Sequence, residues 1–266
     1  MILAFLLALL ISLLAWRFRA LTVNGALAAT VVGSLIFGLG GWRWALLLLL
    51  FFFTSSALTR AFVHRKRKLS EKFAKGGQRD AMQVMANGGV AALCVLAHFA
   101  FPQALWSWLG FAASLAAVNA DTWATELGVL SPHPPRRITN WQIVEEGASG
   151  GITLLGTSAA LLGSALIALP AAFLPPLPIS HPLLTFVLVT LAGLIGSLID
   201  SLLGDTLQAI YFCPRCRKET EHFPRHSCGT ATSRLRGLPW LDNDGVNIAC
   251  ALSAALLALA FALLFG

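Results

Sequence analysis

The sequence predicts an all-α membrane protein, a polytopic bundle of about eight transmembrane helices with a small zinc-binding cytoplasmic loop. Three observations lead to this fold class. Of the 266 residues, 57% are hydrophobic and 12% are charged, with a mean hydropathy of +0.75, far from the composition of soluble domains. The apolar residues form runs close to the ~20 residues that cross a bilayer. Basic residues gather in alternate connections between the runs. We expect one membrane domain, residues 1–266, with the loop at residues 213–228 inside it.

Eight apolar segments are long enough to be considered as spans. The first is the shortest, but it lacks the basic start and small-residue cleavage site of a signal peptide, so a removed leader is the weaker interpretation. A half-buried re-entrant segment is the alternative to a full span at this position. The spans are expected at Ile2 to Trp16, Val23 to Gly40, Trp44 to Thr59, Met82 to Phe101, Trp108 to Val129, Gly150 to Phe173, Leu183 to Phe212 and Leu241 to Phe265.

The basic residues set the orientation, because Lys and Arg accumulate in short cytoplasmic loops. With the N-terminus outside, Arg43 is the only basic residue that falls outside the inner loops. We therefore expect a multi-pass protein of the cytoplasmic membrane whose active face is cytoplasmic. The stretch His64 to Lys68 is interpreted as a topology determinant, with attraction of anionic headgroups or a phosphorylated substrate as the alternative. Loop orientation explains the net charge of +7, so nucleic acid is not an expected partner.

Acidic residues lie inside two of the apolar segments, where an ionised carboxylate is costly and indicates function. Asp121 and Glu126 share one segment, and Asp200 and Asp205 share another. Small residues at helical spacing accompany both pairs, so these acids should face the bundle interior. Ion pairing with a buried Arg is the structural alternative, although no Arg or Lys lies within these two segments. Asp-Thr-x3-Glu and Asp-Ser-x3-Asp also resemble each other, which hints at a duplicated half-site.

Further polar groups fall near the expected inner rim. Asp244 and Asn247 begin the last span, and such oxygens suit Mg²⁺; helix capping by Asp242 or Asn243 is the equal alternative. A glycine-rich turn that opens a helix is able to bind phosphate, and Arg matches phosphate bidentately. Packing by small residues explains such glycines equally well. The candidate phosphate-binding residues of this region are Arg136, Arg137, Gly150 and Gly151, and Asn87 adds an amide near the rim.

Cysteine spacing predicts a metal site. Cys213 and Cys216 form Cys-x2-Cys, and His226 and Cys228 follow, which matches a closed structural Cys₃His zinc site. His222 is an alternative fourth ligand. A disulfide competes with this interpretation, but the loop maps to the reducing cytoplasm.

The ordered blocks resemble a known family across nearly the whole chain. They are Asn119 to Gly128, Gly147 to Thr153, Asp200 to Gly204 with Gln208, Cys213-x2-Cys216 to His226-x-Cys228-Gly229, and Asn243-Asp-x2-Asn247. This set is similar to the integral-membrane family numbered ninety-two among domains of unknown function, which includes plant phytyl-phosphate kinase and animal transmembrane protein nineteen. Asp205 departs from the family pattern, in which a small residue is expected.

The resemblance implies phosphorylation of an isoprenoid monophosphate by a nucleoside triphosphate, with CTP as the expected donor. Phosphoryl transfer depends mainly on positioning and charge neutralisation, and the acceptor phosphate is already anionic, so no general base is required. We expect Mg²⁺ to be held by Asp121 and Asp200 with Glu126 or Asp244. The transferred group would be neutralised by Arg136, Arg137 or Arg236, and phosphates or metal-bound water would be oriented by Asn87, Asn119 and Asn247.

Three other functions compete with the kinase. Cytidylyl transfer to a lipid phosphate is the neighbouring enzymatic alternative. Transport by alternating access would use the same buried acids, but the outer halves of the spans contain no acidic residue. A lipid-binding scaffold leaves the acids unexplained. The expected partners are the bilayer, an isoprenoid phosphate and a nucleoside triphosphate, and a homodimer is left open.

Overall fold

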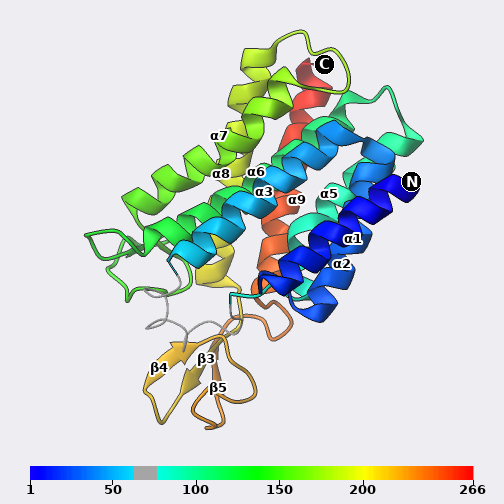
Figure 1. The fold of residues 1–266 in the computed structure, drawn as a ribbon. Coiled ribbons are helices and arrows are strands. Elements are labelled where there is room, and N and C mark those ends of the chain that lie inside the picture. The colour runs from blue at the N-terminus through cyan, green and yellow to red at the C-terminus, as the bar shows by residue number, and fades with distance from the viewer. Residues whose placement is uncertain (63–76, 266) are drawn as a thin grey trace.

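The structure, a computed structural model, describes residues 1–62 and 77–265 and confirms the predicted fold class (Figure 1). The basic stretch His64 to Lys68 lies outside the described residues. The helices are α1 (Ile2–Arg17), α2 (Val23–Leu35) with its π-helical extension η1 (Ile36–Gly40), α3 (Trp42–Ala61), α5 (Ala81–Ala100), α6 (Leu105–Gly128), α7 (Leu154–Phe173), α8 (Pro182–Thr206) and α9 (Asn243–Phe265).

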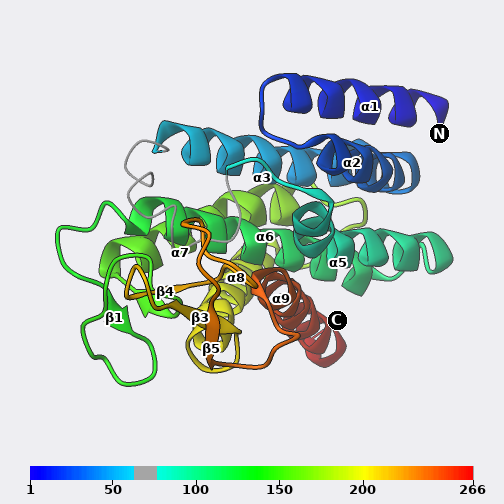
Figure 2. The same cartoon turned by 90° about the horizontal axis from the view of Figure 1, so that it is seen from below.

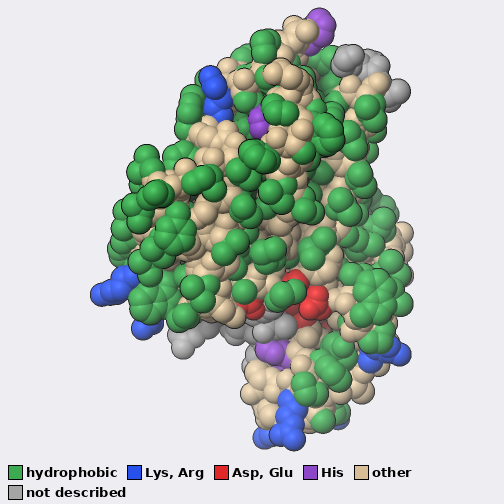
Figure 3. Space-filling model, turned by 90° about the vertical axis from the view of Figure 1, so that its right-hand side faces the viewer, with side chains coloured by type: hydrophobic (Ala, Val, Ile, Leu, Met, Phe, Trp, Pro, Cys, Tyr) green, Lys and Arg blue, Asp and Glu red, His purple; other side chains and the backbone are tan. Residues whose placement is uncertain are grey.

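Among the described residues, six helices are long and apolar enough to cross a membrane. Helix α1, the predicted first span, has 16 residues and is shorter than these six. Helix α6, which is also predicted to span, is present but is not one of the six. Helix α6 carries Asp121, Glu126 and several Trp, Ser and Gly residues, so its mean hydropathy is below that of the six. Outside the bundle core, the helical surface is largely hydrophobic, and the acidic side chains visible in Figure 3 gather at its lower margin.

Helix α6 is the centre of the bundle. It packs against α3, α5, α7, α8 and α9 (Figure 2), and most of its residues from Ser107 to Ala120 are buried. The predicted small-residue stripes allow this packing. A Cβ added at Gly196 of α8 would lie 2.7 Å from the Ala117 Cβ and 3.0 Å from the Cys250 carbonyl oxygen, so α6, α8 and α9 cross in close contact.

Several helix ends differ from the predicted boundaries, and three of these differences lie at the end of the bundle that carries the sheets. Helix α8 ends at Thr206, not Phe212, because the following apolar residues enter a β-strand. Helix α7 begins four residues after Gly150, where the Thr153 hydroxyl accepts a hydrogen bond from the Gly156 amide at 2.9 Å. Helix α9 begins after Asp242, whose Oδ1 accepts a hydrogen bond from the Gly245 amide at 3.0 Å. The latter two are side-chain caps of the usual kind.

Small sheets cover the end of the bundle where α6 and α8 finish and α9 begins. Strand β3 pairs antiparallel with β4 on one side and β5 on the other, and β1 pairs with β2 in the loop between α6 and α7. We call the segment 207–242 the sheet module; it lies below the helices in Figure 1. The strands are β1 (Arg136–Arg137), β2 (Gly151–Ile152), β3 (Ile210–Cys213), β4 (Lys218–Thr220) and β5 (Ser233–Arg236).

Candidate functional site

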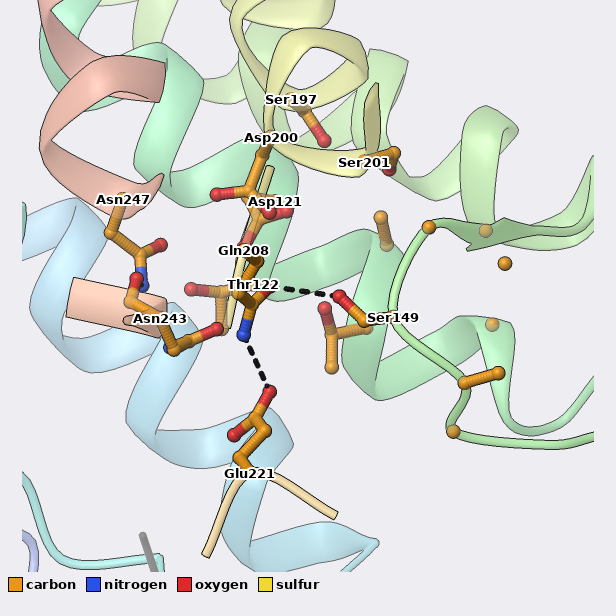
Figure 4. Close-up of a pocket in the computed structure, with 18 of the residues that line it drawn as sticks. Asp121, Thr122, Ser149, Ser197, Asp200, Ser201, Gln208, Glu221, Asn243 and Asn247 are labelled. Atoms are coloured by element: carbon orange, nitrogen blue, oxygen red, sulfur yellow. Dashed lines mark hydrogen bonds between the residues drawn. The ribbon is translucent and has the colours of Figure 1, made fainter. Parts of the chain in front are cut away.

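A large polar cavity lies between the helix ends and the sheet module. Its volume is about 1010 Å³, and α5, α6, α8, α9, the sheet module and the segment Gly147 to Thr153, here called the glycine-rich loop, all contribute to its wall. Figure 4 shows that polar side chains from these separate elements point toward a common space. Of the residues selected from the sequence, those that line it are Asn87, Asp121, Glu126, Gly150, Gly151, Asp200, Asp244 and Asn247.

Asp121 of α6 and Asp200 of α8 lie next to each other in this cavity (Figure 4). Asp200 interacts electrostatically with Asp121 and with Glu221 of the sheet module. Within the described residues, the buried Asp200 Oδ2 has no hydrogen-bond partner. Adjacent carboxylates repel each other, and a buried oxygen without a partner is costly. A bound cation would relieve both effects.

The start of α9 supplies amide and carboxylate oxygens beside this pair. Asn243 and Asn247 face the cavity (Figure 4), and the Asn247 amide donates to the Asn243 carbonyl oxygen at 3.0 Å. Asp244 also lines the cavity and is only 4% exposed. Asp242 caps the helix, so the capping interpretation holds for Asp242, while Asp244 and Asn247 line the cavity.

Arg79 is a cavity residue that the sequence analysis did not select. It precedes α5 and is held by its backbone, since its carbonyl oxygen accepts from the Thr22 amide at 3.0 Å and its amide donates to the Ala20 carbonyl at 2.9 Å. Burial lowers the pKa of the Arg79 guanidinium to about 10, and the nearby Glu126 carboxylate opposes this change. A cation therefore lies in the same cavity as the acids.

Glu126 connects α6 with this arginine. Its Oε1 accepts a hydrogen bond from the Thr59 hydroxyl of α3 at 2.8 Å, and its charge acts on Arg79. The side chain is 4% exposed. Glu126 is therefore built into the wall of the cavity through contacts with α3 and with the segment before α5.

The three arginines selected from the sequence are not among the residues that line the cavity. Arg137 pairs with Asp205 at 3.1 Å, and Arg136 donates to the Trp141 carbonyl oxygen at 2.9 Å. Arg236 donates to the Gly204 carbonyl at 2.9 Å and also to the Asp205 carbonyl. Burial lowers the pKa of Arg236, while Glu219 and Asp205 act in the opposite direction.

The glycine-rich loop packs against the end of α8. Gly150 has φ of +80°, and a Cβ there would lie 2.3 Å from the Asp205 Cβ. The neighbouring Ser149 hydroxyl donates to Gln208 Oε1 at 2.8 Å, and the Gln208 amide donates to Glu221 at 3.0 Å (Figure 4). The conformation of Gly150 is thus explained by packing, while the loop still borders the cavity.

Asn119 lies away from the cavity, fully buried between helices. Its amide donates to the Gly163 carbonyl oxygen of α7 at 2.7 Å, and its Oδ1 accepts from the Thr54 hydroxyl of α3 at 3.2 Å. Asn119 therefore joins α6 to two neighbours.

The sheet module contains a group of residues with metal-binding chemistry. The ligand atoms of Cys213, Cys216, His226 and Cys228 all lie within 4.8 Å of one another. The Cys213 and Cys228 sulfurs are 3.6 Å apart, and His226 Nδ1 is 3.2 Å from the Cys228 sulfur. Bond lengths of about 2.3 Å to sulfur give tetrahedral edges of about 3.8 Å, so the four atoms suit one metal ion.

The same geometry distinguishes between the alternatives for this loop. All five cysteines of the chain are free thiols, and His226, not His222, completes the cluster. Hydrogen bonds with Thr230 and His226 lower the pKa of Cys228 to about 5, which favours the thiolate that binds metals. His222 instead lines the polar cavity.

These features define a polytopic membrane protein with a polar cavity at one end of its helix bundle and an adjoining cysteine–histidine cluster. The chain belongs to the family described as integral membrane protein DUF92, which matches residues 6–255.

Curated relatives occur in plants and archaea. The chain is 34% identical to protein PGR of Arabidopsis thaliana over 93% of this chain and 91% of that protein. It is 32% identical to an uncharacterized membrane protein of Methanocaldococcus jannaschii, over 73% and 77% of the two chains. The chloroplastic protein VTE6 of Arabidopsis thaliana is 28% identical, over 86% of this chain and 61% of that protein. No solved structure matches the chain.

Proposed function

We propose that this protein is a membrane prenyl-phosphate kinase that transfers a phosphoryl group from a nucleoside triphosphate, CTP in this proposal, to a prenyl monophosphate such as phytyl phosphate. The observation that carries the proposal is the convergence of Asp121, Asp200 and the α9 oxygens in one cavity with Arg79. Membership of a family that includes a plant phytyl-phosphate kinase supports the same reaction.

In the proposed reaction, an oxygen of the acceptor phosphate attacks the γ-phosphorus of the donor. The bond between that phosphorus and the β–γ bridging oxygen breaks, and the nucleoside diphosphate leaves with the bonding electrons. The acceptor oxygen is already deprotonated, so no proton has to be removed. The protein's part is to align the two phosphates and to offset their negative charge.

Asp121 and Asp200 are proposed to hold Mg²⁺, with Asp244 and Asn247 at the edge of the same site. The metal would supply charge neutralisation between the donor phosphates. The unpartnered Asp200 oxygen supports this assignment, because Mg²⁺ is commonly bound by one or two carboxylates together with phosphate oxygens and water.

We assign the neutralising cation to Arg79, because it lines the cavity whereas Arg136, Arg137 and Arg236 do not. Glu126 then positions Arg79 and is not itself a metal ligand. Asn87 of α5 is proposed to orient a phosphate oxygen. The ion in the sheet module is proposed to be Zn²⁺ in a structural role, since four protein ligands leave no open position.

The cavity is proposed to open to the cytoplasm. It lies at the end of the bundle that carries the Arg-rich connections, whereas Arg43 at the start of α3 belongs to the opposite end. That asymmetry follows the distribution of positive charge in membrane proteins, and it gives a cytosolic nucleotide access to the site.

The test is a single-turnover assay of purified protein with Mg²⁺, CTP or ATP, and phytyl, geranylgeranyl or farnesyl monophosphate. The proposal expects a prenyl diphosphate together with CDP or ADP. Formation of a CDP-lipid with release of diphosphate would show that the reaction is cytidylyl transfer and not phosphoryl transfer. Absence of turnover in folded protein would refute the kinase, and cation-driven uptake into proteoliposomes would then support a transporter.

A further inference from the structure

A second cavity, with an apolar lining, lies between α6, α8 and α9. Its volume is about 210 Å³, and Thr185 is the single polar residue among those that line it. Ile195 of α8 and Leu257 of α9 are each 41% exposed, so this space is a groove at the helix surface. We call it the α8–α9 groove. In the bilayer, a hydrocarbon chain is the compatible occupant.

The groove leads toward the polar cavity along one face of α8. Ile195 lines the groove, and Leu198, one helical turn further, lines the polar cavity. Residues at this spacing share a helix face. At 1.5 Å per residue, Ile195 lies about 7 Å and Leu188 about 18 Å from Asp200 along the axis. A tail that leaves the polar cavity at Leu198 is therefore in line with the groove.

The opposite face of α8 gives no room for such a chain. Gly196 packs against α6 and α9, where an added Cβ would be 2.7 Å from the Ala117 Cβ. Hydrocarbon must therefore follow the partly exposed edge marked by Leu198, Ile195 and Leu191. Leu191 also lines the groove and is 44% exposed. This edge gives access from the lipid without passage through the tightly packed centre.

We infer that the α8–α9 groove binds the isoprenoid tail of the substrate, an inference that rests on the proposed kinase function. A five-carbon chain anchored at Asp200 reaches at most the near end of the groove at Ile195, whereas a chain of four isoprene units is long enough to extend through it. The groove therefore determines selectivity for tail length, while the polar cavity binds the phosphates.

The test compares Leu257→Trp with a matched control. Leu257 lines the groove, whereas Leu252 lies on the same helix, is 45% exposed and lines neither cavity. Each variant is assayed with geranylgeranyl and dimethylallyl monophosphate. Leu257→Trp should raise KM for the long substrate at least tenfold and leave kcat/KM for the short one within about twofold. Leu252→Trp should change neither. Equal effects on both chain lengths, or none on the long chain, would overturn the inference.

A binding measurement keeps the groove testable without turnover. A geranylgeranyl phosphate with a terminal diazirine is photo-crosslinked to the wild type, and labelled peptides are mapped. Labelling within residues 182–206 and 243–265 that is competed by unlabelled geranylgeranyl phosphate and lost in Leu257→Trp supports the groove. Labelling that competitor does not reduce would assign the groove to ordinary bilayer lipid and overturn the inference. If the protein shows no turnover but the groove is labelled specifically, the proposed kinase function is refuted and the assignment of the groove to the isoprenoid tail stands.

Discussion

Glu126 on α6 and Asp205 on α8 have matching environments. Each follows a cavity aspartate by five residues, and each accepts a hydrogen bond from a threonine hydroxyl of another segment, Thr59 at 2.8 Å and Thr139 at 2.5 Å. Each also interacts with an arginine, Arg79 for Glu126 and Arg137 for Asp205. In both helices, the second acid thus anchors the helix end, and the first acid faces the cavity.

Arg79 and Arg136 give a direct comparison of two assignments for the phosphate-binding cation. Arg79→Gln should raise KM for the phosphorylated substrates at least tenfold, because a hydrogen bond to a charged group is worth about 1.5–3 kcal/mol. Arg136→Gln should change KM less than twofold, since Arg136 does not line the cavity. Steady-state kinetics of both variants provide the measurement. A larger increase in KM for Arg136→Gln than for Arg79→Gln would assign the phosphate-binding role to Arg136.

Gly150→Ala should destabilise the protein by about 2–3 kcal/mol. The residue has φ of +80°, and the new Cβ would overlap Asp205 at 2.3 Å, so backbone strain and steric overlap add together. Gly89→Ala is the control, because its Cβ would meet only the Met85 methyl at 3.8 Å and Ala favours a helix. Thermal unfolding in detergent measures both. Equal unfolding midpoints for Gly150→Ala and Gly89→Ala would show that the glycine-rich loop accommodates the added Cβ without loss of stability, and would contradict the prediction.

Loss of the proposed zinc ion should impair the polar cavity as well as the sheet module. Cys213→Ser is expected to lower zinc content, measured by elemental analysis, from one ion per chain to well below one. Turnover should fall with it, because Glu221 and His222 of the module line the cavity and Glu221 accepts from Gln208. Cys94→Ala, outside the cluster, should retain the ion. Full activity of a zinc-free Cys213→Ser protein would disprove the coupling.

Sequence periodicity was sufficient for the helix bundle because apolar length and small-residue stripes are local signals. The elements that sequence periodicity did not predict are strands, which depend on pairing with segments elsewhere in the chain. Ile210, Tyr211 and Phe212 are apolar enough to continue a span, yet they form β3 because strands β4 and β5 pair with them. The cysteine–histidine spacing was also local, and it selected the cluster correctly while leaving His222 or His226 open.

The cavity was harder to predict than the fold because several of its residues meet only through tertiary packing. The acids inside α6 and α8 were visible as exceptions to an apolar pattern. Arg79 was not, because it lay among many loop cations and nothing in its local sequence distinguishes it. Its proximity to Glu126 arises from the docking of the segment before α5 against α3 and α6. Conversely, Asn119 resembled a site residue but joins helices.

The acid pair gives the most direct test of the central claim. Asp121→Asn and Asp200→Asn should each slow the single-turnover formation of prenyl diphosphate by about 100-fold or more at saturating Mg²⁺, with unchanged unfolding midpoints. Glu219→Gln, a carboxylate-to-amide change outside the cavity, should retain the wild-type rate. Wild-type rates in folded Asp121→Asn and Asp200→Asn proteins would contradict the proposal that this pair holds the metal for phosphoryl transfer.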